Sequence, residues 1–235
     1  MKLYSRNNAA KQWILSEIEN LASSGQIRVC DIGCGSGSVW PAFVHDHASL
    51  TYVGLDTDAS EIEKAKKNFA DCTNAKVFVA DGQKFREEEG TFDVVTAFSA
   101  LEHVVDLSAF VKTTLALLKS GGVAYLNYDA GHFRSHDIKE RLMVPVSQLL
   151  AKFGYEAPYM KEVDDRQLKE IVAVQGGSVV ALRKHNLHMM KRVMKDEKDE
   201  TILSWYAYED QLNTMIPTEK LDAALWSTTL VLKKA

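Results

Sequence analysis

The sequence has few cysteines, no long apolar run and no surplus of basic charge. Its three cysteines, Cys30, Cys34 and Cys72, are too few and too unevenly spaced for a disulfide framework, and their spacing does not fit a zinc site. No apolar run reaches the ~20 residues that cross a bilayer. The first residues also lack the apolar region of a signal peptide. We therefore expect reduced thiols, a cytoplasmic protein and no membrane partner.

The chain carries a formal net charge of −4 over 235 residues, whereas dedicated nucleic-acid binders usually carry a basic surplus. Nucleic acid is therefore not expected as a partner. One basic run, residues 183–195, is followed at once by acidic residues. Such a mixed run is typical of a solvated surface, although it could also hold an anionic group of a substrate.

Apolar runs of strand length alternate with segments of helical periodicity as far as residue 129. Asp58 and Glu61 form a capping-box pattern at the start of one predicted helix. Strands that alternate with helices indicate an α/β fold, in which a doubly wound parallel sheet is covered on both faces. Helices are predicted at 9–22, near Pro41, at 58–70 and at 107–119, the last closed by Gly121 and Gly122; strands are predicted at 27–33, 50–56, 75–81, 91–98 and 123–129.

Beyond residue 129 the alternation loosens. Residues 130–162 are predicted to be an insertion that is partly helical and interrupted by Pro145, and residues 189–225 a second insertion. A helix at 164–177, a strand at 178–185 and a final strand at 226–234 complete the pattern. We expect one domain, residues 1–235, in which the first insertion forms a helical lid.

Three glycines at alternate positions, Gly33, Gly35 and Gly37, follow the first predicted strand. Glycine lets the backbone turn sharply and approach a ligand closely, at the sheet edge where parallel sheets bind their ligands. The spacing differs from the G-x-G-x-x-G of dinucleotide sites, because Ser38 occupies the position of its last glycine. The glycines alone are therefore compatible with more than one nucleotide-like ligand.

Acidic residues also stand at the ends of predicted strands. Asp31, Asp56 and Asp81 stand at the ends of three successive predicted strands. An acid in the position of Asp56 can hydrogen-bond both hydroxyls of a ribose. An acid in the position of Asp81 can accept a hydrogen bond from an adenine amino group. A single strand-end aspartate is often a helix cap or a turn residue, but three in succession favour an adenosyl ligand.

At this point the chain resembles the class I S-adenosylmethionine (SAM)-dependent methyltransferases. The residues that carry the resemblance are DIGCGSG (31–37), GLDTD (54–58), VADG (79–82), FDVVTAFSALEHVVD (92–106) and LLKSGGVAYL (117–126). The resemblance implies a Rossmann-like sheet of seven strands with an antiparallel last strand, which suits residues 226–234. It also implies that the backbone around Ser99 lies near the sulfonium. The cofactor-binding residues it implies are Asp31, Gly33, Cys34, Gly35, Asp56, Thr57, Asp81, Gly82, Gln83 and Ser99.

The methyl group of a sulfonium is already activated, so an enzyme gains most by aligning the acceptor and excluding water. Only a poor nucleophile, such as a phenol or an alcohol, also needs a base. His103 follows the fourth predicted strand and is our candidate for that base, because its near-neutral pKa suits proton removal. It could instead be a histidine that only caps or packs.

Residues 100–104, ALEHV, also resemble a stretch of ubiquinone-pathway O-methyltransferases and of small-RNA 3′-end methyltransferases. Those families imply a metal site built from a glutamate and, three residues later, a Glu-His pair. Glu102 and His103 match the pair, but Ser99 replaces the earlier glutamate, and only His132 could add a ligand. Since catalytic metals usually need three protein ligands, we expect no metal.

The first insertion is expected to select the acceptor, because loops at this edge of a sheet commonly line the pocket. The sequence thus predicts methyl transfer from SAM to oxygen or nitrogen of a small molecule. Alternatives are a protein or RNA methyltransferase that docks through residues 183–195, a nicotinamide-dependent dehydrogenase, and a SAM-binding protein without catalysis. The candidate acceptor contacts are Phe133, Arg134, Tyr155, Tyr159 and Met160.

Overall fold

Seven strands form one sheet in the order β3-β2-β1-β4-β5-β7-β6 in the computed structural model, which describes residues 2–86, 88–129, 138–151, 153, 159–187 and 190–234. β7 runs antiparallel to both of its neighbours, and the other neighbouring strands pair in parallel. The predicted fold class is confirmed. The strands are β1 (Ile27–Ile32), β2 (Leu50–Asp56), β3 (Ala75–Val79), β4 (Phe92–Phe98), β5 (Leu118–Asp129), β6 (Gly177–Leu187) and β7 (Leu225–Lys234).

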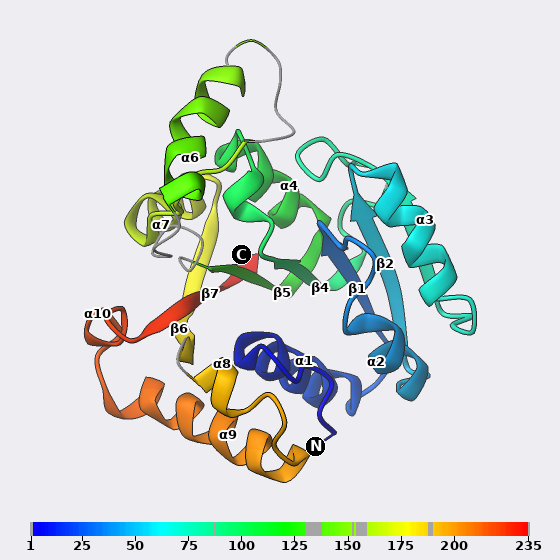
Figure 1. Ribbon diagram of the computed structural model, residues 1–235. Helices are drawn as coiled ribbons and strands as arrows, with labels where there is room; N and C mark the ends of the chain where they lie inside the picture. The colour runs from blue at the N-terminus through cyan, green and yellow to red at the C-terminus, as the bar shows by residue number, and fades with distance from the viewer. Residues whose placement is uncertain are drawn as a thin grey trace.

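Helices cover both faces of this sheet (Figure 1). One apolar cluster packs α1, α2 and α3 against the sheet, and a second packs α4 and α7 against the opposite face. The helices are α1 (Ala9–Ala22), α2 (Trp40–Asp46), α3 (Ala59–Asn68), the 3-10 turn η1 (Leu101–His103), α4 (Leu107–Leu117), α6 (Ile138–Ala151), α7 (Asp165–Val174), α8 (Met190–Val193), α9 (Asp199–Met215) and α10 (Thr218–Leu221). Among the described residues, no helix is both long enough and apolar enough to span a bilayer.

The strand β5 contributes side chains to both apolar clusters. Val123 and Tyr125 belong to the cluster of α1, α2 and α3, whereas Ala124 and Leu126 belong to that of α4 and α7. Successive side chains of a strand point to opposite faces, so a continuous apolar run is required of a strand that is buried on both. This is why these strands read as unbroken apolar runs in the sequence.

Two expectations about single elements were wrong. The glycines Gly121 and Gly122 do not close α4, which ends at Leu117; they lie within β5, beside an irregular register between β4 and β5. Gly121 has φ +75, so these glycines serve a bend in the strand. Pro145 does not interrupt α6, which continues through it. A proline lacks the backbone N–H that would donate one hydrogen bond within a helix, and α6 accommodates that loss.

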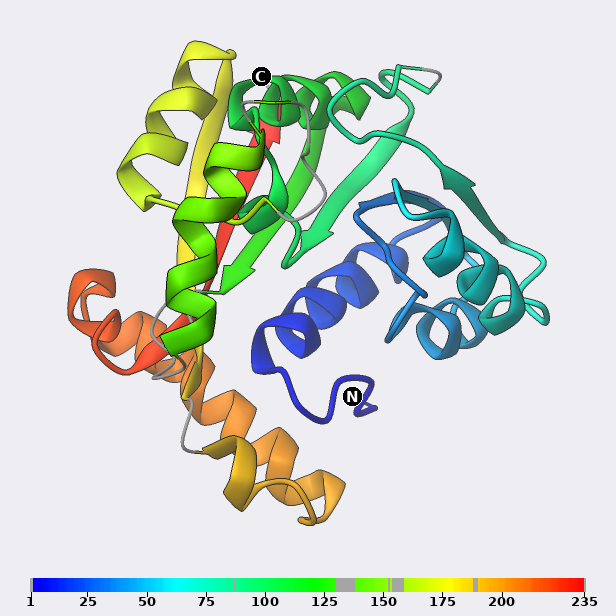
Figure 2. The ribbon, with the colours of Figure 1, turned by 45° about the horizontal axis from the view of Figure 1, so that its top comes forward.

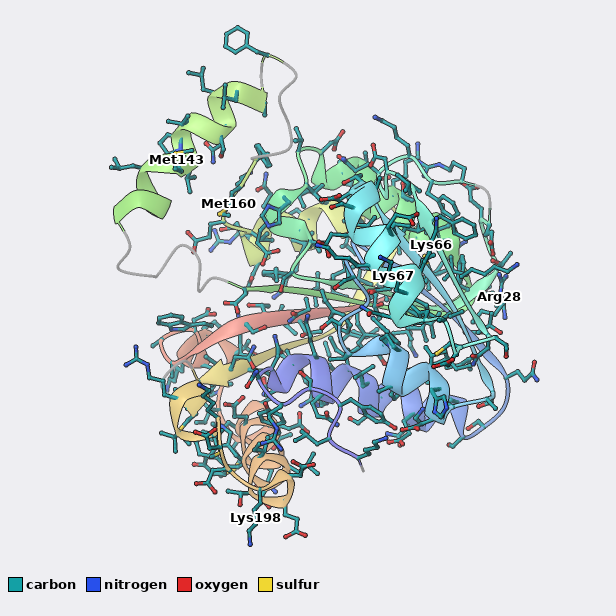
Figure 3. The ribbon with its side chains drawn as sticks, turned by 45° about the vertical axis from the view of Figure 1, so that its right-hand side comes forward. Arg28, Lys66, Lys67, Met143, Met160 and Lys198 are labelled. Atoms are coloured by element: carbon teal, nitrogen blue, oxygen red, sulfur yellow. The ribbon has the colours of Figure 1, made fainter. Side chains whose placement is uncertain are left out.

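The helix α6 lies at the edge of the molecule, where Met143 is far from the sheet in Figure 3, and its residues Ser147 and Gln148 bond the backbone of Met160. Its apolar side chains are largely exposed, with Leu142 at 65% and Leu149 at 55%. Among the α6 side chains that the structure describes, residues 142–151, none lines either of two large cavities, of about 610 and 290 Å³. The assignment of residues 130–162 as a lid therefore stays a prediction.

The connection from β6 to β7 carries α8, α9 and α10, and α9 packs against β6 and α1 (Figures 1 and 2). One buried carboxylate anchors it. Glu209 is 1% exposed and accepts hydrogen bonds from the backbone N–H of Asn186 (2.8 Å) and of Leu187 (3.0 Å) and from Trp205 Nε1 (2.8 Å). This single side chain thus ties the middle of α9 to the end of β6.

Replacing Glu209 with Ala should lower the free energy of unfolding by about 3 kcal/mol, because three donors lose a charged acceptor inside the protein. Urea unfolding followed by circular dichroism measures the change. Gln211→Ala, at an exposed position of the same helix, is the matched control and should stay within about 0.5 kcal/mol of the parent. Equal stability of the two variants would show that α9 is not anchored through Glu209.

Candidate active site

A cleft of about 290 Å³ opens where β1, β2 and β4 end, and most of the predicted site residues line it. The carboxyl ends of parallel strands meet at one edge of the sheet, so residues far apart in the chain converge there. Asp56 and Asp81 both line this cavity, as a site for an adenosyl group requires. The predicted residues on its wall are Gly33, Asp56, Thr57, Asp81, Gly82, Gln83, Ser99 and His103; Ile32, Ala80, Ala100, Val104 and Phe110 complete the lining.

Three backbone N–H groups fasten the glycine loop to the end of β2. The N–H groups of Gly33 and Cys34 both donate to the carbonyl oxygen of Leu55, at 2.7 and 3.0 Å. The N–H of Gly35 donates to Asp56 Oδ2 at 2.8 Å. These donors are therefore used inside the protein, and the loop presents a fixed shape to the cleft.

Two of the glycines are required by the backbone and by close neighbours. Gly33 has φ +78, and a Cβ there would lie 2.7 Å from the Cβ of Ala100. Gly37 has φ +94, and a Cβ there would lie 2.6 Å from the ring of Phe69. A larger residue would have to displace both the loop and its neighbour. Gly37 therefore packs the loop against the end of α3 and does not line the cleft.

The carboxylates of the cleft are held by local backbone donors. Asp56 Oδ1 accepts from the N–H of Asp58 at 2.9 Å, in addition to the bond from Gly35. Asp81 Oδ1 accepts from the N–H of Gln83 at 2.8 Å, and Lys84 Nζ lies 3.1 Å from Asp81 Oδ2. Burial acts to raise the pKa of Asp81, but the Gln83 N–H and the Lys84 ammonium together hold it below its usual value.

Asp31, Cys34 and Gly35 do not line the cleft, although they were predicted among its residues. Asp31 is 1% exposed and lies beneath the loop, where it accepts hydrogen bonds from Thr96 Oγ1 (2.7 Å) and from the Tyr52 hydroxyl (3.2 Å). Cys34 is buried as well, and all three cysteines, which lie in the described part of the chain, are free. The structure thus gives Asp31 contacts that join β1 to its two neighbouring strands, β2 and β4.

The turn that follows β4 forms the opposite wall of the cleft. Ser99 has φ +52, a left-handed conformation that is uncommon for a residue with a side chain, and its N–H donates to the carbonyl oxygen of Asn127 at 2.9 Å. η1 follows at once, with buried Leu101 and Glu102 and exposed His103. Glu102 Oε1 accepts from the N–H of Asp129 at 2.5 Å, which fixes η1 to the end of β5.

His103 is oriented by the last residues of the first insertion. Its Nδ1 lies 3.0 Å from the carbonyl oxygen of Tyr159, and the N–H of Lys161 donates to the carbonyl oxygen of Glu102 at 2.8 Å. A carbonyl can only accept, so Nδ1 carries the hydrogen in this contact, and Nε2 is the nitrogen with the lone pair when the ring is neutral. His103 is thus held in the tautomer that a general base requires.

A second cavity of about 610 Å³ lies on the other side of η1, and sequence reasoning missed it. Glu102 lines it, whereas the next residue, His103, lines the first cleft. Six carboxylate side chains line this cavity against two basic ones, Arg166 and Lys184. The acids come from η1, from the end of β5, from the start of α7 and from α10: Glu102, Asp129, Glu162, Asp164, Asp165 and Asp222.

Lys184 forms the buried floor of the second cavity. It is 3% exposed, and its Nζ lies 2.7 Å from Asp165 Oδ2, 2.6 Å from Asp222 Oδ1 and 2.7 Å from Thr228 Oγ1. Tyr128 donates its hydroxyl hydrogen to Asp165 Oδ1 at 2.6 Å. Burial and the charge of Asp165 raise the pKa of Tyr128 well above its usual value, so it stays a donor. Ion pairs thus join β6, α7 and α10.

The basic run 183–195 does not form one solvated surface, which corrects the sequence-based expectation. Its first residues belong to β6, where Lys184 and His185 are buried and Arg183 donates to Asp210 Oδ1 at 2.7 Å. Burial lowers the pKa of His185 to about 3, so this histidine is neutral. The tertiary structure therefore uses these residues to join β6 to α1 and α9.

The described residues contain no group of three His, Cys, Asp or Glu side chains that could hold a metal ion. His132, Phe133, Arg134 and Tyr155 lie outside the described residues. Tyr159 is buried and Met160 is half-buried, and the Met160 N–H donates to Ser147 Oγ at 3.3 Å. Tyr159 and Met160 are thus the two proposed acceptor contacts that the structure describes, and they pack where α6 meets the rest of the domain.

Comparison with known proteins identifies the kind of domain. A family model described as a methyltransferase domain matches residues 5–182. The chain is 26% identical over 178 residues to a ubiquinone biosynthesis O-methyltransferase of Vibrio parahaemolyticus, an alignment that covers 72% of this chain and 74% of the relative. It is 34% identical over 112 residues to a sterol 4-C-methyltransferase of Caenorhabditis elegans, which covers 47% of this chain and only 33% of that relative.

A solved structure agrees in fold. The geranyl diphosphate C-methyltransferase of Streptomyces coelicolor A3(2), crystallised with Mg²⁺, geranyl diphosphate and S-adenosyl-L-homocysteine, superposes with a TM-score of 0.62 over 96% of this chain and 79% of that one. The sequence identity is 9%, so this likeness shows the fold alone. The family match decides between SAM and a dinucleotide in favour of SAM.

Asp31 makes folding stability depend on pH. Burial raises its pKa from 3.8 to about 7. Between pH 4 and 7 the folded protein holds a proton that the unfolded chain has lost, so this residue's contribution to stability decreases as pH rises. The difference in unfolding free energy between the parent and Asp31→Asn should change by about 4 kcal/mol over this range. Urea unfolding at several pH values measures it, and parallel curves would contradict the assignment.

Proposed function

This chain belongs to the class I SAM-dependent methyltransferases, and from that premise we propose that it transfers a methyl group to oxygen or nitrogen of a small molecule. The observation that carries the proposal is the position of His103. It stands on the wall of the cleft that Asp56 and Asp81 share, and its Nε2 is left available as an acceptor. A base so placed serves an acceptor that must lose a proton.

We assign the cleft to SAM, because its lining has the chemistry of an adenosyl site. Asp56, next to the exposed end of β2, offers carboxylate oxygens to the ribose hydroxyls. Asp81, Gly82 and Gln83 flank the adenine, and Ile32 and Phe110 supply apolar surface for its ring. The backbone of Gly33 and Ser99 borders the part nearest to η1, where the sulfonium belongs.

When bound, SAM supplies an electrophilic methyl group. The protein's own residues then have two tasks. The fastened glycine loop and η1 hold donor and acceptor in line, and such alignment can contribute about 7–11 kcal/mol to lowering a barrier. His103 accepts the acceptor's proton at Nε2 while the carbonyl oxygen of Tyr159 holds the hydrogen on Nδ1.

Small-molecule acceptors agree with the relatives. The names of two relatives refer to ubiquinone biosynthesis and to a sterol. A protein or RNA acceptor would need the basic run as its docking surface, and two of its basic residues, Lys184 and His185, are buried in β6. A small organic acceptor is therefore the better supported proposal.

Asp56→Asn should weaken binding of SAM and of S-adenosylhomocysteine by tenfold or more, because an amide offers one acceptor oxygen where the carboxylate offers two. Isothermal titration calorimetry with S-adenosylhomocysteine measures the affinity. Asp71→Asn, at an exposed position away from the cleft, is the control and should bind normally. Unchanged affinity of Asp56→Asn would remove the ribose assignment.

His103→Ala should lower kcat by about 10²–10⁴-fold for an acceptor that must be deprotonated, the usual contribution of general-base catalysis. Its affinity for S-adenosylhomocysteine should stay within about twofold, since His103 stands on the acceptor side. Radiolabelled methyl transfer and calorimetry measure the two quantities. His45→Ala, at an exposed site on α2, is the control. Full activity of His103→Ala would discard its role as a base.

A further inference from the structure

We propose that Ser147, on α6, is a positioning residue that holds His103 in the orientation and the tautomer of a base. This inference deepens the proposed function and rests on it, because it takes His103 as the base of that reaction. Ser147 does not itself line the cleft. It acts through residues 159–161, which bond α6 on one side and η1 on the other.

The first bridge between the two elements is the peptide group that joins Tyr159 to Met160. Its carbonyl oxygen lies 3.0 Å from His103 Nδ1, from which it accepts, and its N–H donates to Ser147 Oγ at 3.3 Å. A peptide group is planar, and in the trans form its C=O and its N–H point in opposite directions. Ser147 and His103 therefore hold the two ends of one rigid unit, so a rotation of that unit at one end moves the other.

The next peptide group, between Met160 and Lys161, forms a second bridge in the reverse sense. Its carbonyl oxygen accepts from Gln148 Nε2 at 3.3 Å, and its N–H donates to the carbonyl oxygen of Glu102 at 2.8 Å. Two consecutive residues of α6 thus meet two consecutive residues of η1 across two consecutive peptide groups. In Figure 3, Met160 lies between α6 and the rest of the domain. The position of this segment against η1 therefore depends on α6.

The direction of the hydrogen bonds gives Ser147 a further effect on His103. The Ser147 hydroxyl donates to the carbonyl oxygen of Val144 at 2.7 Å, so its oxygen is free to accept from the Met160 N–H. The donors then follow one direction, from His103 through the peptide group to Ser147 and on to Val144. Hydrogen bonds in such a chain polarise one another, which strengthens the carbonyl that keeps the hydrogen on Nδ1.

Burial sets Ser147 apart from its neighbours. Among the described side chains of α6, residues 142–151, it alone is buried, at 2% exposure, whereas Leu149 is 55% exposed. Apolar burial is the usual means by which a helix is fixed on a domain, and these side chains of α6 provide little of it. The polar contacts with Met160 therefore carry a larger share of the attachment of α6 than such contacts usually do.

The tautomer of His103 is the readout that tests the inference, because it requires no acceptor. Protein labelled with ¹⁵N at its histidines is measured by NMR at about pH 8, where histidine rings are normally neutral. The ring-nitrogen shifts distinguish a hydrogen on Nδ1 from one on Nε2, and His103→Gln identifies the signals. We expect the hydrogen on Nδ1 in the parent. In Ser147→Ala the ratio of Nε2–H to Nδ1–H should rise about fivefold, the effect of one ordinary hydrogen bond on an equilibrium. Unchanged His103 signals in this variant overturn the inference.

A second variant and a control guard against a simple loss of stability. Gln148→Ala removes the other contact of α6 with Met160 from a half-buried position, and it should change the same ratio in the same direction, by about twofold. Ser16→Ala is the matched control, because the Ser16 hydroxyl also donates to the carbonyl three residues earlier in its helix, at 2.7 Å, but in α1. As large a change of the His103 signals in Ser16→Ala as in Ser147→Ala overturns the inference.

A double-mutant cycle shows whether the effect passes through His103. With catechol as the phenolic probe of methyl transfer, Ser147→Ala should lower kcat about fivefold and leave the KM for SAM within about twofold. Added to His103→Ala, it should lower kcat no further, because the residue that it positions is already absent. Equal losses of kcat in the two backgrounds contradict a positioning role.

The outcomes also separate this inference from the proposed function. Full activity of His103→Ala refutes the base, whether or not the tautomer responds to Ser147. Low activity of His103→Ala, together with unchanged His103 signals in Ser147→Ala, refutes the positioning role alone.

Discussion

The attachment of the glycine loop to the end of β2 is the constraint on which the cleft depends. The carbonyl oxygen of Leu55 accepts from both Gly33 and Cys34, and the carboxylate of Asp56 accepts from Gly35. These bonds fix the loop relative to the residues that we assign to the ribose. Both oxygens of Asp56 accept structural hydrogen bonds, Oδ2 from the N–H of Gly35 and Oδ1 from that of Asp58, and the same carboxylate makes the proposed ligand contact. A loop held this way does not have to be ordered when the cofactor binds, which removes part of the entropic cost of binding.

The turn η1 is held as firmly from the other side. Asp129, at the end of β5, donates to the side chain of Glu102, and Lys161, at the end of the first insertion, donates to its carbonyl oxygen. The left-handed conformation of Ser99 lets the chain leave β4 and enter the turn at once. The geometry of His103 therefore depends on three segments that are distant in sequence. This placement makes the residue sensitive to the insertion even where the insertion does not touch the cleft.

Local patterns predicted most of the fold. The cap at Asp58 accepts from the N–H groups of Ser60 and Glu61 as predicted, but the second bond of a capping box is not formed, because the Asp58 N–H donates to Asp56 Oδ1. The apolar runs became strands because both faces of the sheet are covered. What failed depended on distant partners. Lys184 and His185 look like surface residues in the sequence, but β7 and α9 bury them. The second cavity could not be predicted from the sequence for the same reason. Its wall joins η1, α7 and the start of β7, and no local motif indicates that these elements lie side by side.

The two cavities differ in how they are built, and this difference bears on which of their residues can vary. The first cleft is lined by the loops that directly follow β1, β2, β3 and β4, whose positions the parallel sheet fixes. The second takes Asp222 from the C-terminal end of α10 and Trp226 from the start of β7. The connection that ends there is anchored through α9, where Glu209 accepts from the backbone N–H groups of Asn186 and Leu187. Residues near Trp226 can therefore vary without disturbing either the anchor or the donor cleft.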